Sequence, residues 1–593
     1  MISKSGVLDP EGRKPMLSRD GVEAAPRLAE GWQCSRICGP SPLCGANGMR
    51  FGPDGRLHVA QAYGGQVSTL DLETGAAEVV PSVGEEIRSP DDLAFDSSGT
   101  MYITEPFVGR VSARSPDGRV RVFAGDLPSA NGITVYQDRV FVDECRPGGR
   151  LLELFGDGRA PRVIADNLQL PNALMVGPDE KLYFPEVSLG EIWRCDLAGG
   201  PPERFLDGLA RPTAVKFDGR GRLVTTDADT GEVTRVDLQT RARTTLTSVR
   251  PGIDNLEFDD DGRLFLSNFV DGGVSEISGD GSERQMLGPG LVGPFGISAG
   301  GGHVLVADVF SVVSISPDGE IDQPLHFAKP GFPGFPRGVA AASASRAWLT
   351  VSAGNVVSCD LESGETSLVA EGLEELYGVA VAPDGRLLVA EGGTGRLLRI
   401  GHGGDVSSIA AGLGRPAGVA AAPDGSCFVT DRDGGRVLHI GADTATVLDG
   451  LGSPQGVAVH DDELFVLDAL RKELIVVSLS SGSRSIVARE LPVGFPPGTP
   501  EGSLPGIPEL MPGPLTTFAG LTVAPDGAVY VAGDAEGSVL EFRRESLQPG
   551  SARAARVGGT PRKKKARTRG VNRSRALDPL RTASQHQAGN RPR

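Results

Sequence analysis

The sequence predicts an all-β protein that consists of two tandem six-bladed β-propellers followed by a disordered basic tail. Three observations favour this fold class: a unit of about 40 residues that recurs along the chain, apolar residues that alternate with polar ones, and frequent glycine turns. Of the 593 residues, 83 are Gly and 44 are Pro. This composition is typical of a turn-rich folded protein and argues against long helices, coiled coils and collagen.

The repeated unit is clearest at Gly378–Ile400. An apolar run leads into a Pro-Asp-Gly turn, a second apolar run ends in an acid, and a Gly-rich turn precedes a third, alternating run. A fourth short run follows. Period-two alternation between such turns predicts four short antiparallel strands, which is the size of one propeller blade.

The unit recurs twelve times, and its opening residue can be followed along the chain. The opening residues are Asn47, Asp91, Asn131, Asn172, Thr213, Asp254, Phe295, Arg337, Tyr377, Ala417, Gln455 and Ala519. Because closed propellers usually have four to eight blades, twelve units predict two rings of six. We therefore expect an N-terminal extension at 1–45, a first propeller at 46–289, a second at 290–545, and a disordered basic tail at 546–593.

Segments outside the repeats lead to two further expectations. Blade twelve lacks a recognisable outer strand, and an open edge promotes aggregation, so we expect Gly12–Trp32 to pack on the first propeller as a closing strand. Two proline-rich connections, Phe327–Pro336 and Leu491–Thr517, lie on one rim of the second propeller. Proline limits their freedom, so they are expected to form a semi-rigid cover, the alternative being surface loops without function.

Charge and cysteine content bear on partners and compartment. The net charge is −17, yet the segment from Ser551 onward is strongly basic, so the body is more acidic than the total suggests. Such a body repels phosphates, which argues against nucleic acid as a partner. No apolar run is long enough for a membrane span, no secretory signal is visible, and seven cysteines fit reduced thiols. We expect a cytoplasmic protein.

Opening residues of blades in one ring converge on the central channel, so each propeller is expected to present one ring of side chains. The first ring is wholly polar and rich in oxygen: Asn47, Asp91, Asn131, Asn172, Thr213 and Asp254. Oxygen donors of this kind suit Ca²⁺ or Mg²⁺. The second ring has no carboxylate, and its Phe295, Arg337, Tyr377 and Gln455 are typical of a ligand-recognition or protein-binding surface.

A second set of residues ends the second strand of each blade. In the first propeller it comprises Gln61, Glu105, Glu144, Glu186, Asp227 and Asn268. Acids also occupy this position in the second propeller, which favours structural hydrogen bonds to neighbouring turns. The alternative is that Glu105, Glu144, Glu186 and Asp227 support the ring residues from behind.

Two blades, "PDDLAFDSSGTMYITE" and "PNALMVGPDEKLYFPE", resemble those of the SMP-30/gluconolactonase/luciferin-regenerating superfamily. In the second half, "YGVAVAPDGRLLVAE" and "PAGVAAAPDGSCFVTD" are more similar to NHL-type blades. The resemblance covers about Ala46 to Phe542 and implies six-bladed propellers. It is much less specific for activity, because fold alone does not settle function.

The resemblance also implies a metal site, from which this sequence departs. In the lactonase family a Glu, two Asn and an Asp from blades one, three, four and five hold the metal. The two Asn correspond to Asn131 and Asn172, whereas the Glu position is Asn47 and the Asp position, which also serves as general base, is Thr213. Carboxylates stand instead at Asp91 and Asp254, so a changed arrangement is expected. The alternative is that these residues only cap their strands.

Three functions follow as hypotheses. The leading one is a metal-dependent hydrolase of a small lactone or ester, in which Asn47, Asp91, Asn131, Asn172 and Asp254 hold Ca²⁺ or Mg²⁺ and Asp91 or Asp254 activates water. The second is a non-catalytic double propeller that binds a protein or small ligand through the second ring. The third is a lyase or biosynthetic cyclase on the same scaffold. Asp91 and Asp254 are expected to flank Asn47 and to raise each other's proton affinity.

Overall fold

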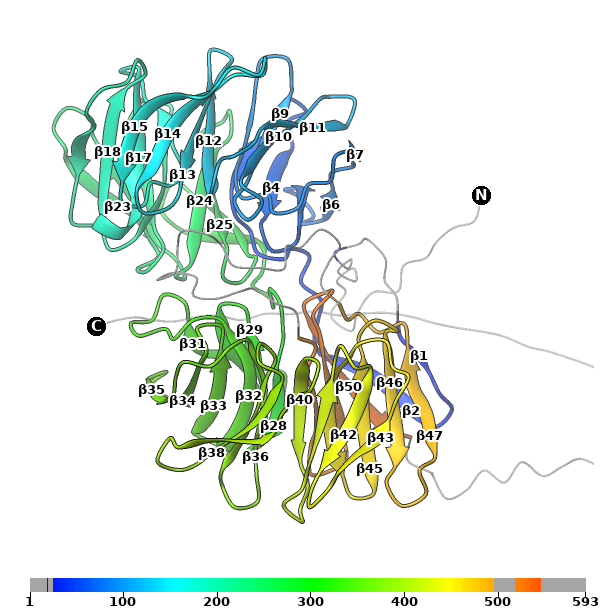
Figure 1. Cartoon of the computed structure of the whole chain (residues 1–593). Helices are drawn as coiled ribbons and strands as arrows, with labels where there is room; N and C mark the ends of the chain where they lie inside the picture. The colour runs from blue at the N-terminus through cyan, green and yellow to red at the C-terminus, as the bar shows by residue number, and fades with distance from the viewer. Residues whose placement is uncertain (1–18, 20–24, 495–517, 546–593) are drawn as a thin grey trace, which may run out of the picture. The chain divides into compact units, whose positions relative to one another are not determined.

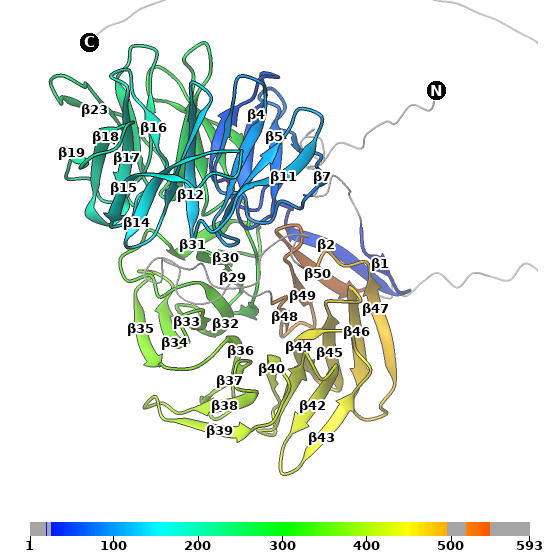
Figure 2. The same ribbon diagram turned by 45° about the horizontal axis from the view of Figure 1, so that its top comes forward.

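The computed structural model describes residues 19, 25–494 and 518–545, and these form twelve β-sheets whose strands pair antiparallel except for β7 (Val83–Gly84) and β11 (Arg119–Ala124), which pair in parallel. Figures 1 and 2 show the sheets as radiating blades of short strands. Apart from one short 3₁₀ turn, η1 (Val187–Leu189), the described residues contain no helix. The expected all-β, propeller-type fold is confirmed.

The first six sheets follow one another along the chain. Their strands are β3–β6 (Met49–Phe51, Leu57–Gln61, Gln66–Leu70, Ala77–Val79), β7–β11 (Val83–Gly84, Leu93–Phe95, Met101–Glu105, Arg110–Arg114, Arg119–Ala124), β12–β15 (Ala130–Tyr136, Arg139–Glu144, Gly149–Leu154, Arg162–Leu168), β16–β19 (Met175–Val176, Lys181–Glu186, Glu191–Asp196, Glu203–Leu206), β20–β23 (Pro212–Phe217, Leu223–Asp227, Glu232–Val236, Arg243–Ser248) and β24–β27 (Ile253–Phe258, Leu264–Asn268, Val274–Ile277, Glu283–Leu287). We call them the first propeller.

The remaining six sheets we call the second propeller. Their strands are β28–β31 (Ile297–Gly300, His303–Asp308, Ser311–Ile315, Ile321–His326), β32–β35 (Pro336–Ser343, Arg346–Val351, Asn355–Asp360, Thr366–Ala370), β36–β39 (Leu376–Val381, Leu387–Glu391, Arg396–Ile400, Val406–Ala410), β40–β43 (Pro416–Ala421, Cys427–Asp431, Arg436–Ile440, Thr444–Leu448), β44–β47 (Pro454–His460, Glu463–Asp468, Glu473–Ser478, Arg484–Arg489) and β48–β50 (Leu521–Val523, Val529–Gly533, Ser538–Arg544). Two short N-terminal strands join these sheets, as described below.

The Pro-Asp-Gly turn predicted from the repeat joins the two innermost strands of a blade. Between β36 and β37 the Gly385 N–H donates to the carbonyl of Ala382 at 2.8 Å, and the Asp384 carboxylate accepts from the Arg386 N–H at 3.1 Å. Gly385 has φ +79°, a left-handed conformation that glycine adopts at no steric cost. The turn chemistry therefore sets where each hairpin reverses.

Each series of six sheets closes on itself. In the first propeller β24 contacts β3, and the Ser267 hydroxyl donates to the Asn47 carbonyl at 2.6 Å. In the second propeller β28 contacts β48, and the Gly520 N–H donates to the Phe295 carbonyl at 2.9 Å. We propose from these contacts that the chain is two tandem six-bladed propellers, with the boundaries 46–289 and 290–545 that the repeat spacing predicts.

Glycine lets the second ring close tightly. A glycine follows the opening residue in all six blades of the second propeller, and a Cβ at Gly338 would stand 2.4 Å from the Tyr377 carbonyl oxygen. Neighbouring backbones therefore approach more closely than any side chain allows. In the first propeller the equivalent positions carry side chains in four blades, including Asp92 and Asn255, so its channel holds polar groups that the second lacks.

The closing strand lies on the second propeller, not on the first as expected. Strand β2 (Trp32–Cys38) pairs antiparallel with β50 and completes the twelfth sheet, and β1 (Arg27–Leu28) pairs with β47 of the eleventh. Trp32 packs edge-to-face on Phe465 and under the guanidinium of Arg544. The prediction that another segment fills the open edge holds, but its placement was wrong because the unpaired edge belongs to blade twelve.

A shared core joins the two propellers. One buried cluster contains Tyr63 and Phe269 of the first propeller together with Phe295, Phe310 and Phe327 of the second. Beside this cluster, the buried Arg19 guanidinium donates to backbone carbonyls of the second propeller, at 2.8 Å for Leu291 and for Val292, and of the N-terminal extension, at 3.2 Å for Ser41. Aromatic packing and one arginine thus hold the ends of several connections together.

Two expectations fall on residues that the structure does not describe. The basic tail at 546–593 lies wholly outside the described residues, and so does most of the insert Leu491–Thr517. The connection Phe327–Pro336 is described, and Phe327 and Phe335 are buried in the shared core. Within the described part of the chain, no helix has the length and apolar character that crossing a bilayer requires.

The closing strand predicts the effect of a single substitution. Trp32 is 8% exposed and belongs to the core between blades eleven and twelve, so Trp32→Ala is expected to lower the free energy of unfolding of the second propeller by about 3–5 kcal/mol. The neighbouring side chain Gln33 is exposed, and Gln33→Ala should change it by less than about 0.5 kcal/mol. Denaturant unfolding monitored by far-ultraviolet circular dichroism, a signal that does not depend on Trp32 fluorescence, measures the free energy of unfolding of both variants. Equal midpoints for the two variants would contradict this role of β2.

Candidate functional site

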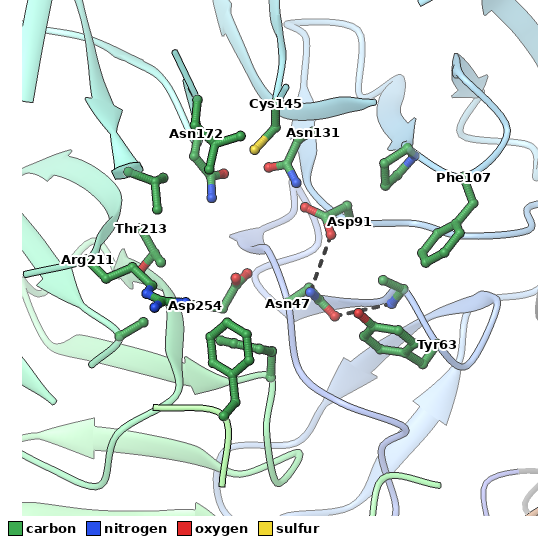
Figure 3. A pocket seen from close by; sticks show the side chains of 17 residues that line it. Asn47, Tyr63, Asp91, Phe107, Asn131, Cys145, Asn172, Arg211, Thr213 and Asp254 are labelled. Atoms are coloured by element: carbon green, nitrogen blue, oxygen red, sulfur yellow. Dashed lines mark hydrogen bonds between the residues drawn. The ribbon is translucent and has the colours of Figure 1, made fainter. Parts of the chain in front are cut away.

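The six opening residues of the first propeller surround one cavity of about 70 Å³. Asn47, Asp91, Asn131, Asn172, Thr213 and Asp254 all line it, and Figure 3 shows their side chains directed toward a common centre. Each stands at, or just before, the start of the innermost strand of its blade. Asn47 and Thr213 are buried, whereas the other four are half-buried and face the cavity. The space is sufficient for several water molecules or a small ligand.

Hydrogen bonds fix two of the six side chains. The Asn47 amide oxygen accepts from the Ala62 N–H at 3.2 Å, and its Nδ2 donates to Asp91 Oδ1 at 3.3 Å. The Thr213 hydroxyl lies 3.0 Å from the Ile253 carbonyl oxygen, to which it donates, and 3.0 Å from the Thr226 hydroxyl. Thr213 thereby bonds to a hydroxyl of its own blade and to the backbone of the next blade, which fits the capping role that the sequence left open.

The amides of Asn131 and Asn172 remain available. Within the described residues neither side-chain amide has a hydrogen-bond partner, although the Asn131 backbone carbonyl accepts from the Thr104 hydroxyl. Both amides face the cavity beside the Cys145 thiol (Figure 3). A half-buried amide without a protein partner is free to bind water, a cation or a substrate oxygen.

The two carboxylates of the ring hold protons tightly. Burial, together with the adjacent Asp92 carboxylate, raises the pKa of Asp91 to about 7. Burial also raises the pKa of Asp254 well above its ordinary value, and the charges of Asp91 and Asp92 add to this. Burial is the largest cause for both carboxyls, and the charge of Asp91 also raises the pKa of Asp254.

The sequence did not indicate that a third acid lies below the ring. Asp143 ends no strand but occupies the position at which other blades carry a hydroxyl, such as Thr104 and Ser267, that donates to a carbonyl of the next blade. Its Oδ1 accepts from the Gly132 N–H at 3.1 Å, and its fully buried Oδ2 has no partner among the described residues. Burial raises the pKa of Asp143 well above its ordinary value, because the buried site disfavours the charged form.

The acids that end the second strands hold the connections between blades. Glu186 accepts from the Leu170 N–H at 2.7 Å, and Asp227 accepts from the Ala210 N–H at 2.7 Å. Glu105 accepts from the Arg88 N–H and binds the Arg110 guanidinium, while Glu144 binds Arg146 and Arg150. None of the four lines the cavity. These hydrogen bonds fit a structural role between blades and do not connect the four acids to the ring residues.

The recognition surface expected on the second propeller is not a surface. Phe295, Arg337, Tyr377 and Gln455 are each 4% exposed or less, because the aromatic cluster between the propellers covers them. The Gln455 side-chain oxygen accepts from the Ala519 N–H at 2.6 Å, and the Arg337 guanidinium lies over the Phe295 ring at 5.3 Å. Their burial argues against an open recognition surface, and ligand binding by these residues stays a prediction.

The walls of the cavity come from residues that the repeat pattern did not single out. Tyr63, Phe107 and Arg211 lie in connections just after a second strand or just before a first strand, and Phe269 follows β25. Phe327 comes from the second propeller, and the Arg211 guanidinium lies 4.7 Å above its ring. Their sequence signal was weak because connections between blades share no common pattern.

Comparison with known proteins connects this geometry to a family. The gluconolactonase of Zymomonas mobilis is 32% identical over 197 residues, which cover 30% of this chain and 48% of that protein. The chain thus spans about half the length of this relative. The chain contains a gluconolactonase-like β-propeller. The NHL-type character expected for the second half stays a prediction, and no protein-family model matches the chain.

The solved structures that match the chain are more distant. Virginiamycin B lyase from Staphylococcus aureus is 16% identical, with 43% of this chain and 90% of that chain covered and a TM-score of 0.27. In a nidogen/laminin complex the matching chain is 22% identical, with 34% of this chain and 79% of that chain covered and a TM-score of 0.31.

The side chains that line the cavity of the first propeller fit a hard divalent cation. Asp91 and Asp254 supply carboxylate oxygens, and Asn131 and Asn172 supply amide oxygens with no competing partner among the described residues. Asn47 is a poorer ligand because its oxygen already accepts a hydrogen bond. Among the described residues no cluster of three or more His, Cys, Asp and Glu could hold a metal, so a cation here would depend on the amides.

The raised pKa of Asp91 predicts how stability depends on pH. The carboxyl has a pKa of about 7 when folded and 3.8 when unfolded, so the folded protein binds more protons between these values. The free energy of unfolding of the cation-free protein should therefore fall as pH rises from about 4 to 7. Asp91→Asn removes this charge and should be more stable than the wild type at pH 8, by a few kcal/mol.

Asp431→Asn provides a control with the opposite sign. Burial alone would raise the pKa of Asp431, but hydrogen bonds from Gly414, Gly434 and Arg436 lower it, so this substitution should destabilise the protein at pH 8. Thermal unfolding of both variants from pH 4 to 8 in the presence of a chelator measures the difference. A wild-type curve parallel to that of Asp91→Asn over this range would show that Asp91 does not hold a proton.

Proposed function

We propose that the first propeller is a metal-dependent hydrolase that acts on a small lactone or ester. The observation that carries this proposal is the convergence of two proton-binding carboxylates and two unpartnered amides on one cavity of a gluconolactonase-like propeller. If these residues had only a structural role, their amides would be hydrogen-bonded within the protein and their carboxylates would lie apart, since buried unpaired polar groups are costly.

Asp91, Asp254, Asn131 and Asn172 are the residues that would hold the cation. When bound, Ca²⁺ or Mg²⁺ would polarise the substrate carbonyl. Neither carboxylate stands where the lactonase family has one, so the family's assignment of roles does not transfer. The assignment proposed here rests on this chain's own geometry.

Asp91 is the proposed general base. Its pKa of about 7 lies near neutrality, where a base is most effective. The Asn47 amide donates to Asp91 and favours its ionised form. Asp91 takes a proton from water, the water oxygen adds to the carbonyl carbon, and the proton passes to the oxygen that leaves, giving a hydroxy acid from a lactone.

No observation favours the alternative functions. The non-catalytic binding protein rested on the second ring, whose Phe295, Arg337, Tyr377 and Gln455 are buried. The lyase or cyclase has no support beyond the shared scaffold. The small-molecule substrate, the protein partner and the cytoplasmic location stay predictions.

Cation binding predicts a change in thermal stability. A ligand that binds only the folded state stabilises it by about 2.7 kcal/mol at one hundred times its Kd, so the melting temperature should rise with added Ca²⁺ or Mg²⁺ and fall with chelator. The response should disappear in Asp91→Asn/Asp254→Asn, and Asp91→Asn should lower kcat/KM for a lactone by roughly 10²–10⁴-fold.

Differential scanning fluorimetry with metal titration measures this response, and acid release at constant pH measures hydrolysis. The variant Asp431→Asn serves as a control for loss of a buried acid outside the cavity and should keep the cation response. If the melting temperature of the wild type changes with neither cation nor chelator, the first ring holds no metal.

A further inference from the structure

The cavity of the first propeller is chemically two-sided. The six ring side chains form a polar floor, whereas Phe107, Leu170, Val187, Phe269 and Phe327 form walls of aromatic and aliphatic groups. Leu170 and Val187 are each 5% exposed, and Phe269 and Phe327 are 7% and 6% exposed, so these walls are already packed from behind. A ligand that reaches the floor must therefore place its body against apolar surface.

Phe327 brings the second propeller into this wall. It follows β31, and its N–H donates to the Phe310 carbonyl at 2.9 Å. Its ring makes edge-to-face contacts with Phe269 at 5.2 Å, Phe332 at 5.8 Å and Phe310 at 6.1 Å between centroids. Contacts on several sides hold the ring in one orientation, which makes Phe327 a rigid part of the wall.

The polar groups of the walls are already engaged or face the floor. The Arg211 Nε lies 2.9 Å from Asp229 Oδ1, and its guanidinium stacks on Phe327, so its charge is neutralised and one face is covered. The Tyr63 hydroxyl points toward Asn47 at the floor (Figure 3). Cys145 offers only a weak donor beside Asn131 and Asn172.

This arrangement restricts the body of the substrate. Hydroxyl groups on the part of a substrate that lies against Phe107, Leu170, Val187, Phe269 and Phe327 would lose water without gaining a partner from these side chains. Each such hydroxyl lowers kcat/KM by about tenfold or more. We infer that the site selects small lactones with an apolar body over polyhydroxylated sugar lactones, and that Phe327 of the second propeller is a specificity-determining residue. The inference rests on the hydrolase proposed above and names the substrate class of the same site.

The chemistry needs no further reactant. Water adds its oxygen to the lactone carbonyl carbon, the bond between that carbon and the ring oxygen breaks, and the ring oxygen takes up the proton that the base removed. The product is a hydroxy acid with an apolar carbon chain, and no atom changes its oxidation state. Selection then depends only on how the carbon skeleton packs during this step.

Two lactones that share a six-membered ring test the inference. δ-Valerolactone has no hydroxyl groups, and glucono-1,5-lactone carries several. With Ca²⁺ or Mg²⁺ present and the spontaneous rate subtracted, the full-length wild type should show a kcat/KM at least about tenfold higher for δ-valerolactone. Phe327→Ala should reduce this ratio about tenfold, mainly through loss of activity on δ-valerolactone.

Phe335→Ala is the matched control. Phe335 belongs to the same connection and the same aromatic cluster, contacts Phe310 at 5.6 Å and is 2% exposed, but it does not line the cavity. The two variants should lose similar stability, while Phe335→Ala keeps the wild-type ratio. A wild type that prefers glucono-1,5-lactone, or equal changes of the ratio in both variants, would overturn the inference and leave the hydrolase standing.

Binding of δ-valerolactam, a ring of the same size that resists hydrolysis, separates this inference from the proposed function. Saturation-transfer NMR should detect binding to the wild type and to Phe335→Ala, and weaker binding to Phe327→Ala. If neither lactone is hydrolysed, the proposed hydrolase fails, and this pattern of δ-valerolactam binding would still support an apolar site bounded by Phe327. Absence of binding to the wild type would overturn it.

Discussion

The closure of each ring of blades is the constraint on which the rest of the structure depends. At the channel the first strands of neighbouring blades exchange backbone hydrogen bonds, as between the Gly48 N–H and the Asp91 carbonyl at 2.7 Å. These bonds fix the distance between opening residues around the ring. Six side chains from segments that span about 200 residues are therefore held at one cavity without any contact designed for that purpose alone.

The two rings close in the same way, but the closure places different side chains at the two channels. In the first, polar opening residues leave amides and carboxylates facing a cavity. In the second, Phe295 and Tyr377 pack into the aromatic cluster, and a glycine after each of the six opening residues lets the backbones approach closely. That core supports Phe327 at the wall of the first cavity. One propeller thus offers polar groups to a ligand, and the other supplies part of the apolar enclosure around them.

The sequence was sufficient for the fold and for the members of the first ring, because alternation and turn glycines repeat in every blade and the opening position is fixed relative to them. It was insufficient wherever the outcome depended on contacts between distant segments. The partner of β2 is one example, since the open edge of β50 lies some 500 residues away. The burial of Tyr377 is another, because an aromatic residue at a channel mouth fits either a binding surface or a core. Arg211 and Phe327 lie in connections whose path the repeat does not encode.

The pairing of β2 with β50 also imposes an order on biosynthesis. Arg36 and its ion-pair partner Glu536 are separated by 500 residues, and at 5–20 residues per second the ribosome needs roughly 25–100 s to supply the second after the first. Throughout this interval the first propeller can fold on the emerging chain, while β2 must stay unpaired. Strand β2 therefore emerges early and is among the last to find its partner, and a nascent chain at this stage exposes Trp32.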